Sequence, residues 1–359
     1  MKRFKSILVV VDERTENRAV VERAVILAQR NQARLTVVNT SRALPRQAPS
    51  LFSPPPPAEV SELAVDIIEE WPPDPGLPAT PQHTPAGERP IGAEMPDTEA
   101  AVVIREQIAE EESQRLERWL DFIRGSGVPV EGKILYGTPF LQIIREVLRD
   151  KHDLVMITAE GRGGLKERLF GSTAMHLMRK CPCPVWVVRP TQLERYGCIL
   201  AAVDPMSQDE TQYALNFKIM DLATALVQRD QCELVVVHTW TFPPEQSLRS
   251  GYSVTSTELD GWVHRAQDVH RRRLTELLQP YLVQDVRFQV YLLKGEPGHL
   301  IPQLAEKLEV GLIVMGTVSR TGVAGLLIGN TAERILRQVG CSVLTVKPDG
   351  FVTPVRWDE

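Results

Sequence analysis

Two stretches of the chain combine glycine with hydroxyl and amide side chains at the same spacing. Each stretch has a four-residue segment, then nine further residues, then a glycine followed by two polar residues. The first stretch is Thr158-Ala-Glu-Gly161 with Gly171-Ser172-Thr173, and the second is Gly316-Thr-Val-Ser319 with Gly329-Asn330-Thr331. Glycine lets the backbone approach an oxyanion closely and adopt positive φ. A helix that starts after the second glycine would turn its free N–H groups and its dipole toward that anion. Both stretches are therefore candidates for binding phosphate.

Other residues that could carry chemistry point to structure. The chain has no Walker lysine after a glycine-rich loop, no Ser/His/Asp or Cys/His set in a supporting context, and no zinc-binding spacing among its seven histidines. Its five cysteines are an odd number in a long chain, which argues against a disulfide framework. We interpret Cys181 and Cys183 as buried structural thiols, with a redox or metal role as the alternative. No catalytic residue and no metal site are expected.

The two glycine-containing stretches belong to an internal repeat. One constant offset aligns the stretch from Gly137 to Pro190 with a later stretch without a gap, and it pairs Gly137 with Gly295, Leu154 with Leu312, Gly171 with Gly329, and Cys183 with Cys341. A second, larger offset pairs Ser6–Asp12 with Cys198–Asp204. Because the period has the size of a domain, the repeat indicates a duplicated domain rather than a solenoid. The expected domains are residues 1–190 and 196–359.

The difference between the two offsets predicts extra length inside the first copy, in a single insertion. Between Pro45 and Pro96 lie 14 of the chain's 27 prolines, and repeated prolines lack N–H donors and disfavour helix in the residues before them. We interpret residues 45–96 as an irregular, solvated excursion with polyproline stretches and a short helix over Val60–Glu70. A segment that docks a partner protein is the alternative.

Each copy is predicted to alternate strands with helices. Continuous apolar runs indicate strands buried on both faces, and the remaining segments have helical spacing. The elements expected in the first copy are Ser6–Val11, Arg18–Gln29, Leu35–Asn39, Glu99–Arg124, Val130–Leu135, Pro139–Arg149, Leu154–Thr158, Ser172–Lys180 and Val185–Val188. Those expected in the second copy are Ile199–Val203, Thr211–Gln228, Leu234–Thr239, Glu258–Tyr281, Arg287–Leu293, Pro297–Lys307, Leu312–Gly316, Thr331–Val339 and Val343–Lys347.

This alternation predicts an α/β fold, in which each copy is a doubly wound parallel sheet. Ligands of such sheets bind beyond the carboxyl ends of the strands, where the strand order switches. The residues directly after the first two strands are therefore candidates as well, namely Asp12 and Thr40 in the first copy and Asp204 and Thr239 in the second.

Composition limits the class of protein. The chain has 359 residues, of which 43% are hydrophobic and 24% charged, so a packed core is expected and wholesale disorder is excluded. A net charge of −5 argues against a general nucleic-acid binder, which needs excess positive charge. No run approaches the roughly 20 apolar residues of a membrane span, and Ile7–Val11 is too short for the core of a signal peptide. A soluble, cytoplasmic protein is expected.

The strand ends resemble those of the universal stress protein family. Its nucleotide-binding members carry an Asp after the first strand and G-x-x-G-x9-G-(S/T) after the fourth, and Asp12, Asp204 and the two glycine-containing stretches occupy these positions. The resemblance covers nearly the whole chain outside residues 45–96. Two copies in one chain indicate the tandem-domain subgroup, and Gly316–Gly322, Gly329–Glu333 and Lys347–Val355 look most like its E-type members.

The resemblance implies two tandem Rossmann-like domains and a nucleotide at each strand edge. ATP, accompanied by Mg²⁺, is the implied ligand: a carboxylate would accept from the adenine amino group, and main-chain groups after the second strand would meet the base edge. The implied binding residues are Asp12, Thr40, Thr158, Gly161, Gly171, Ser172, Thr173, Asp204, Thr239, Gly316, Ser319, Gly329, Asn330 and Thr331.

Both copies depart from the family pattern. Thr158 replaces the first glycine of the first copy and adds a Cβ beside the base, whereas that copy keeps Gly161 and the phosphate end, Gly171-Ser172. In the second copy Ser319 and Asn330 replace a glycine and a Ser/Thr, although asparagine can still cap a helix. Each change removes room or conformational freedom without abolishing an anion site.

Three functions therefore stay open. The first is a non-catalytic stress-response protein that binds an adenine nucleotide and signals to partners. The second is a scaffold or carrier that holds another ligand, apolar or lipid-like, in the same clefts, covered by the long helices Glu99–Arg124 and Glu258–Tyr281. The third is a slow ATP hydrolase. The first is favoured over the second, and the third is the least favoured because no base beyond Asp12 and Asp204 is evident.

The assembly can be predicted from the last strand of each copy. Val185–Val188 and Val343–Lys347 end at equivalent positions. Family members pair through this edge strand, and pairing satisfies its exposed hydrogen-bonding groups. We expect the two copies to form an internal pseudo-dimer through these strands. A homodimer of the whole chain is a further option.

Overall fold

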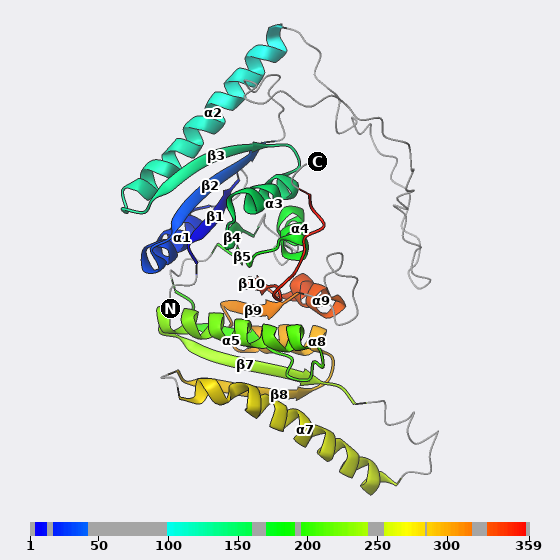
Figure 1. Cartoon of the computed structure of the whole chain (residues 1–359). Coiled ribbons are helices and arrows are strands. Elements are labelled where there is room, and N and C mark those ends of the chain that lie inside the picture. The colour runs from blue at the N-terminus through cyan, green and yellow to red at the C-terminus, as the bar shows by residue number, and fades with distance from the viewer. Residues whose placement is uncertain are drawn as a thin grey trace, which may run out of the picture. The chain divides into compact units, whose positions relative to one another are not determined.

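A computed structural model describes residues 4–12, 17–41, 99–159, 170–190, 195–242, 255–283, 286–317 and 329–356, with side chains from residue 106 onward in the helix that begins at Glu99. The proline-rich segment 45–96, with the helix expected over Val60–Glu70, lies outside these residues, as do Gly161 and Ser319. The chain divides into two compact units, residues 45–110 and the remainder. All ten strands found in the described residues lie in the second of these units (Figure 1).

Among its described residues, the first copy contains five strands and four helices, which match the elements expected there. They are β1 (Ser6–Val11), α1 (Arg18–Asn31), β2 (Arg34–Ser41), α2 (Glu99–Arg124), β3 (Val130–Tyr136), α3 (Pro139–Asp150), β4 (Leu154–Thr158), α4 (Ser172–Lys180) and β5 (Val185–Val188). The predicted elements are confirmed, most of them within two residues at each end.

The second copy repeats this order. Its elements are β6 (Cys198–Ala202), α5 (Glu210–Asp230), β7 (Glu233–Trp240), α7 (Ser256–Leu282), β8 (Phe288–Lys294), α8 (Pro297–Lys307), β9 (Leu312–Gly316), α9 (Asn330–Gln338) and β10 (Ser342–Val346). The backbone repeats as well: Gly137 and Gly295 both have positive φ, at 118° and 142°, directly before α3 and α8. Only glycine adopts this conformation without strain, which explains why the glycine recurs.

The ten strands form one mixed sheet in the order β3-β2-β1-β4-β5-β10-β9-β6-β7-β8. Within each copy all neighbouring strands are parallel, and the order reverses between β1 and β4 and between β6 and β9. The copies meet at β5 and β10, which pair antiparallel with Leu344 opposite Trp186. The fold is therefore a tandem pair of Rossmann-like halves joined edge to edge as an internal pseudo-dimer.

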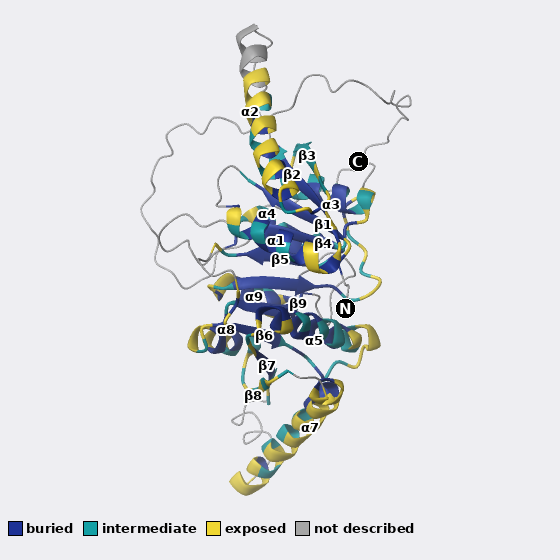
Figure 2. Ribbon diagram, turned by 90° about the vertical axis from the view of Figure 1, so that its left-hand side faces the viewer, coloured by how far each residue is buried: buried dark blue, intermediate teal, exposed yellow. Residues whose placement is uncertain are grey.

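Helices cover both faces of this sheet, because alternate strand residues point to opposite sides. Ile7 and Val9 of β1 pack in a core cluster with α1, α5 and residues of α2 and α7. Leu8 and Val10 pack in a second cluster with α3, α4, α8 and α9. Each cluster contains residues of both copies, so the packing is continuous across the β5–β10 junction (Figure 2).

The basic residues that follow β5 and β10 reach across this junction. Lys347 Nζ donates to the carbonyl oxygens of Met178 at 2.8 Å and Arg179 at 3.0 Å, at the end of α4. Arg189 Nη2 donates to the carbonyl of Val339, just beyond α9, at 3.2 Å. The N–H groups of an amine or guanidinium at a helix C-terminus can donate to the carbonyls that the helix leaves unsatisfied. Each copy therefore caps a helix of the other.

The strand registers correct the expectation of one insertion in the first copy. Ser6 pairs with Arg34 and Cys198 with Glu233, so the path from the first strand to the second is shorter in the first copy than in the second. Leu35 pairs with Val130 and Leu234 with Phe288, so the path from the second strand to the third is much longer in the first copy. The difference between the two sequence offsets is therefore the sum of two changes in length: a shorter first connection and a much longer second connection in the first copy.

None of the described helices combines the length and the apolar character needed to cross a bilayer. All five cysteines are free thiols, and the Sγ atoms of Cys181 and Cys183 lie 3.5 Å apart in the core. A hydrogen bond from Cys181 and burial raise the pKa of the Cys183 thiol well above its usual value. The Cys183 thiol therefore stays protonated at neutral pH, as expected of a structural cysteine.

Candidate functional site

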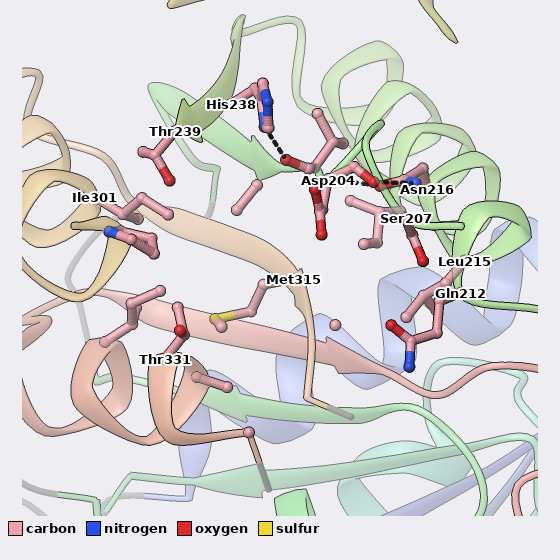
Figure 3. A pocket seen from close by; sticks show the side chains of 18 of the residues that line it. Asp204, Ser207, Gln212, Leu215, Asn216, His238, Thr239, Ile301, Met315 and Thr331 are labelled. Atoms are coloured by element: carbon pink, nitrogen blue, oxygen red, sulfur yellow. Dashed lines mark hydrogen bonds between the residues drawn. The ribbon is translucent and has the colours of Figure 1, made fainter. Parts of the chain in front are cut away.

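One buried asparagine fastens the carboxyl end of β6 to α5. Asn216, 2% exposed, accepts from the backbone N–H of Asp204 at 2.7 Å and donates to its carbonyl at 3.0 Å. The Asp204 carboxylate accepts from the N–H of Met206 at 3.3 Å. These bonds hold Asp204 where β6 ends, with its side chain directed into the open space that Figure 3 shows.

That space is a cleft of about 470 Å³ beyond the ends of β6, β7 and β9, with residues of α5, α8 and α9 in its walls. The cleft brings together all of the second copy's predicted binding residues that the structure describes: Asp204, Thr239, Gly316, Gly329, Asn330 and Thr331. In Figure 3, Ser207 and Gln212 lie on the side of α5, and Ile301 and Thr331 lie across the cleft from them. The cleft therefore lies at the point where the strand order switches between β6 and β9.

The wall formed by α9 can receive an anion. This nine-residue helix begins after Gly329, whose N–H donates to the Thr317 carbonyl at 3.0 Å and which, as a glycine, offers no side chain to cap the helix start. The N–H groups of the first turn therefore receive no cap from the N-cap residue itself. Asn330 and Thr331 occupy this turn and are exposed. A phosphate oxygen would meet both the N–H donors and the positive end of the dipole here.

Charge in the cleft is sparse. Among the described residues that line it, Asp204 carries the only formal charge. Glu333, one turn into α9, pairs with Arg337 at 2.8 Å and with Arg179 of the first copy at 2.7 Å. The hydrogen bond from Arg337 holds the pKa of Glu333 below its usual value despite partial burial. Its negative charge is thus balanced and does not oppose an anion at the helix start.

His238 forms part of the cleft wall next to Thr239. Its Nδ1 lies 3.2 Å from the carbonyl oxygen of Val203, and its Nε2 lies 2.8 Å from Nδ1 of His270 on α7. Because a carbonyl can only accept, Nδ1 of His238 carries the proton and Nε2 accepts from His270. The Trp240 ring stacks on His270 with centroids 5.3 Å apart. This buried arrangement fixes His238 within the sheet, in keeping with a structural role.

In the first copy, the corresponding strand end is also held by an asparagine. Asn17, which is buried, accepts from the Asp12 N–H at 3.3 Å and donates to its carbonyl at 2.5 Å. The Thr158 hydroxyl donates to the same asparagine at 3.5 Å. Asp12 and Thr158 are therefore neighbours, as predicted. Ser172 and Thr173 begin α4 after Gly171, and Ser172 does not cap this helix because Gly171 is the N-cap. Thr40 lies at the end of β2, opposite Leu135 of β3.

Comparison with known proteins decides the family. The sequence profile described as "Universal stress protein family" matches residues 3–90 and 89–189 in the first copy and 195–347 in the second. The chain belongs to the universal stress protein family. It is 31% identical over 268 residues to Universal stress protein E of Escherichia coli strain K12, covering 74% of this chain and 82% of that one. The protein of the same name from Photorhabdus laumondii is 24% identical and is covered over 99% of both chains.

Solved structures of universal stress proteins share the tandem fold. A putative universal stress protein from Pseudomonas aeruginosa UCBPP-PA14 superposes with a TM-score of 0.62 at 21% identity, over 98% of this chain and 95% of that one. One from Archaeoglobus fulgidus gives 0.56 at 14% identity, over 95% and 98%. At these identities the likeness establishes the fold. Together with the curated relatives, it confirms the resemblance to tandem, E-type universal stress proteins.

The packing around Gly316 shows what a glycine permits at this strand end. A Cβ on Gly316 would lie 2.7 Å from Cδ2 of Leu215 on α5. The missing side chain thus lets α5 approach the end of β9. In the first copy Thr158 occupies this position, and its hydroxyl donates a hydrogen bond to Asn17. The predicted crowding of a nucleotide base by Thr158 stays a prediction.

Sequence reasoning missed Asn17 and Asn216. They form the same pair of hydrogen bonds at the two strand ends. A third offset aligns these two asparagines, and it also aligns Thr40 with Thr239. This third offset is the sequence signal that identifies the two asparagines as equivalent. The alignment of the first strands does not reveal it, because the loops between strand and helix differ in length and the first strands therefore align at another offset.

The expectation that the long helices cover the clefts is wrong for the second copy. Residues of α7 such as Leu274 and Leu278 pack on the sheet, and none of its residues lines the cleft at Asp204. With β8, α7 instead frames a separate groove of about 370 Å³. The reason is that α7 needs its apolar face to bury β8, the last strand of the sheet, and therefore lies to one side of the switch point.

Proposed function

We propose that this universal stress protein is a non-catalytic stress-response protein that binds an adenine nucleotide in the cleft of its second copy. The observation that carries the proposal is the concavity itself, because it collects Asp204, Thr239, Gly316 and the start of α9 around one space. In an open α/β sheet this is the ordinary place for a ligand.

The chemistry of the walls suggests how the nucleotide lies. The first-turn N–H groups of α9 would bind phosphate, and the Asp204 carboxylate at the opposite strand end would accept from the exocyclic amino group of adenine. Main-chain groups at Thr239 would contact the base edge. Because the described lining contains no lysine or arginine, Mg²⁺ would accompany the phosphates and offset their charge.

The first copy is the weaker candidate for the same ligand. Thr158, whose hydroxyl donates to Asn17, occupies the strand end at which the second copy has Gly316. A nucleotide there would have to displace the threonine side chain. The proposal therefore predicts one nucleotide per chain.

Base discrimination provides the test. ATP with Mg²⁺ should raise the thermal midpoint of unfolding more than GTP does, because guanine presents a carbonyl oxygen where adenine presents an amino group. Asp204→Asn should remove most of this preference, and the matched change Asp12→Asn in the first copy should leave it intact. No shift with ATP at concentrations well above those of the cell, or a preference that survives Asp204→Asn, would contradict the proposal.

Carriage of an apolar ligand is the second candidate. The observation in its favour is the number of aliphatic side chains in the cleft wall, including Leu215, Ile219, Ile301 and Ile335. A native mass spectrum of the freshly purified chain distinguishes the two functions. A bound lipid-sized molecule that ATP does not displace supports carriage, whereas a mass increment equal to a nucleotide supports the first function.

A further inference from the structure

A second cluster of chemically active side chains lies at the other edge of the sheet, before β4. Glu146 and Asp150 belong to α3, and Lys151, with φ of 52°, ends this helix in the left-handed conformation. The chain therefore turns sharply, and His152 returns beneath the helix with its N–H donating to the Val147 carbonyl at 3.2 Å. One ligand atom from each of Glu146, Asp150 and His152 lies within 4.8 Å of the others.

The imidazole of His152 is held as a metal-binding histidine would be. Its side chain is 0% exposed, and Nδ1 lies 2.9 Å from Oγ of Ser6, which also accepts from Nε of Arg34 at 3.0 Å. Within the described part of the chain, Nε2 has no hydrogen-bond partner and lies 3.9 Å from Oε1 of Glu146. Leaving a buried ring nitrogen unpaired is costly. A cation between this nitrogen and the carboxylates would satisfy it.

The ammonium group of Lys133 on β3 now stands beside these carboxylates. Nζ lies 2.8 Å from Oε1 of Glu146, 2.5 Å from Oδ2 of Asp150 and 3.3 Å from Oε1 of Glu131. Arg149 pairs with the other oxygen of Glu146 and lies 3.5 Å from Oδ1 of Asp150. The Lys133 side chain is 27% exposed, so it can swing outward. The acidic pair is thus already arranged around a positive charge that can be replaced.

We propose that Glu146, Asp150 and His152 form a site for a divalent transition-metal ion of the Zn²⁺ class, which displaces the Lys133 ammonium. Zn²⁺ binds imidazole nitrogen and carboxylate oxygen at about 2.0–2.2 Å, so its ligand atoms lie roughly 3–4 Å apart. A small inward movement of the carboxylates reaches that spacing. Mg²⁺ and Ca²⁺ prefer oxygen ligands and would not use the buried nitrogen.

The second copy lacks this cluster, which makes the site particular to the first. The positions equivalent to Glu146, Asp150 and His152 are Leu304, Leu308 and Val310, and Tyr291 stands in place of Lys133. All four are uncharged, although the left-handed helix end recurs at Glu309. The polar residues are thus not required by the fold of the repeat. We therefore expect no Zn²⁺ binding from the equivalent positions of the second copy.

Titration of the chelator-treated full chain with Zn²⁺, and separately with Mg²⁺, tests the proposal by calorimetry under reducing conditions. We expect one saturable Zn²⁺ site and no saturable Mg²⁺ site. His152→Gln should weaken Zn²⁺ binding at least about tenfold, as should Ser6→Ala through loss of imidazole orientation. Lys133→Met should strengthen it by about tenfold, because the competing charge is gone. Asp150→Asn, at a partly exposed residue, replaces His152→Gln if that variant does not fold.

Because the chain also contains thiols, Co²⁺ substitution identifies the ligands. Visible bands without thiolate charge transfer, perturbed by His152→Gln, are expected for this site. The proposal is overturned by absence of saturable Zn²⁺ binding, by equal affinities in Lys133→Met and His152→Gln, or by a thiolate charge-transfer band of full intensity. None of these results depends on nucleotide binding in the cleft of the second copy.

Discussion

Single side chains decide how firmly each strand end is held. Asn216 bonds both backbone polar groups of Asp204, and Asn17 does the same for Asp12. A side-chain amide that bonds both groups of one residue acts as a short extension of the sheet. Removing it takes a hydrogen-bond partner from a partly buried donor and a partly buried acceptor.

We predict that Asn216→Ala lowers the free energy of unfolding by about 1–3 kcal/mol, because the N–H and carbonyl of Asp204 lose their partner. The same variant should weaken ATP binding, since the carboxylate loses its fixed position. Urea unfolding and calorimetry measure the two effects. Asn17→Ala is the matched control, with a similar loss of stability and unchanged ATP affinity; an unchanged affinity in Asn216→Ala would refute the positioning role.

Lys347 makes stability depend on pH. Burial lowers its pKa from 10.5 to about 7. Between these values the unfolded chain binds more protons than the folded one, so the free energy of unfolding should rise with pH by about 1.4 kcal/mol per unit. Above the ordinary thiol pKa of 9.0 an opposite trend begins, because burial raises the pKa of Cys341 to about 12.

We therefore predict that Lys347→Met flattens the rise in stability between about pH 7 and about pH 8.5. Arg189→Met, which removes the equivalent cation from the other copy, should keep the rise, because arginine does not titrate in this range. Urea midpoints measured across the interval give the comparison. A slope that is the same in wild type and Lys347→Met would show that Lys347 keeps an ordinary pKa.

At the scale of elements, strands and helices were largely predictable and their ends were not. The apolar run Ser6–Val11 predicted β1 without error, because a strand buried on both faces has a continuous pattern. Helix α1 continues to Asn31, beyond its predicted end at Gln29, and stops at Gln32 in the left-handed conformation. Glycine is the usual signal for such an end, so glutamine there offered no warning.

The candidate site was predictable in outline only. The residues after the strands were expected at one edge, and Asp204, Thr239 and Gly316 do line one cleft. Asn216 was missed because a polar residue on an amphipathic helix is normally assigned to the solvent face, and Asn17 because it precedes α1 as its N-cap residue. The position of α7 was mistaken because periodicity defines an apolar face without saying which strand it covers.

The junction between β5 and β10 leads to a prediction at this scale. Trp186 of β5 is 0% exposed and lies opposite Leu344. Trp186→Ala should lower the free energy of unfolding by about 3–5 kcal/mol, because a large cavity opens at the junction. Trp262→Ala on α7, at a side chain 37% exposed, should change it by less than about 0.5 kcal/mol. Denaturant unfolding measures both, and similar small losses would contradict burial of Trp186.

For the whole molecule, the continuous sheet and the shared core clusters indicate that the copies stabilise one another. Trp119 belongs to the first copy and Trp240 to the second. We predict that, in the otherwise unchanged chain labelled with 5-fluorotryptophan, the 19F resonances of Trp119 and Trp240 report the same urea midpoint. Such coincidence indicates one cooperative transition. Two midpoints, with one copy folded while the other is unfolded, would show that the β5–β10 junction contributes little.

The account as a whole depends on an anion-binding helix start in the second copy, and Asn330→Asp examines it most directly. A carboxylate at the first position of α9 favours the helix dipole but repels phosphate, so the fold should be at least as stable as wild type. Calorimetric titration with ATP and Mg²⁺ should show one site per chain in wild type and in the matched variant Ser172→Asp, and at least about tenfold weaker binding in Asn330→Asp. Equal binding in Asn330→Asp and wild type, or loss in Ser172→Asp instead, would contradict a nucleotide site in this cleft.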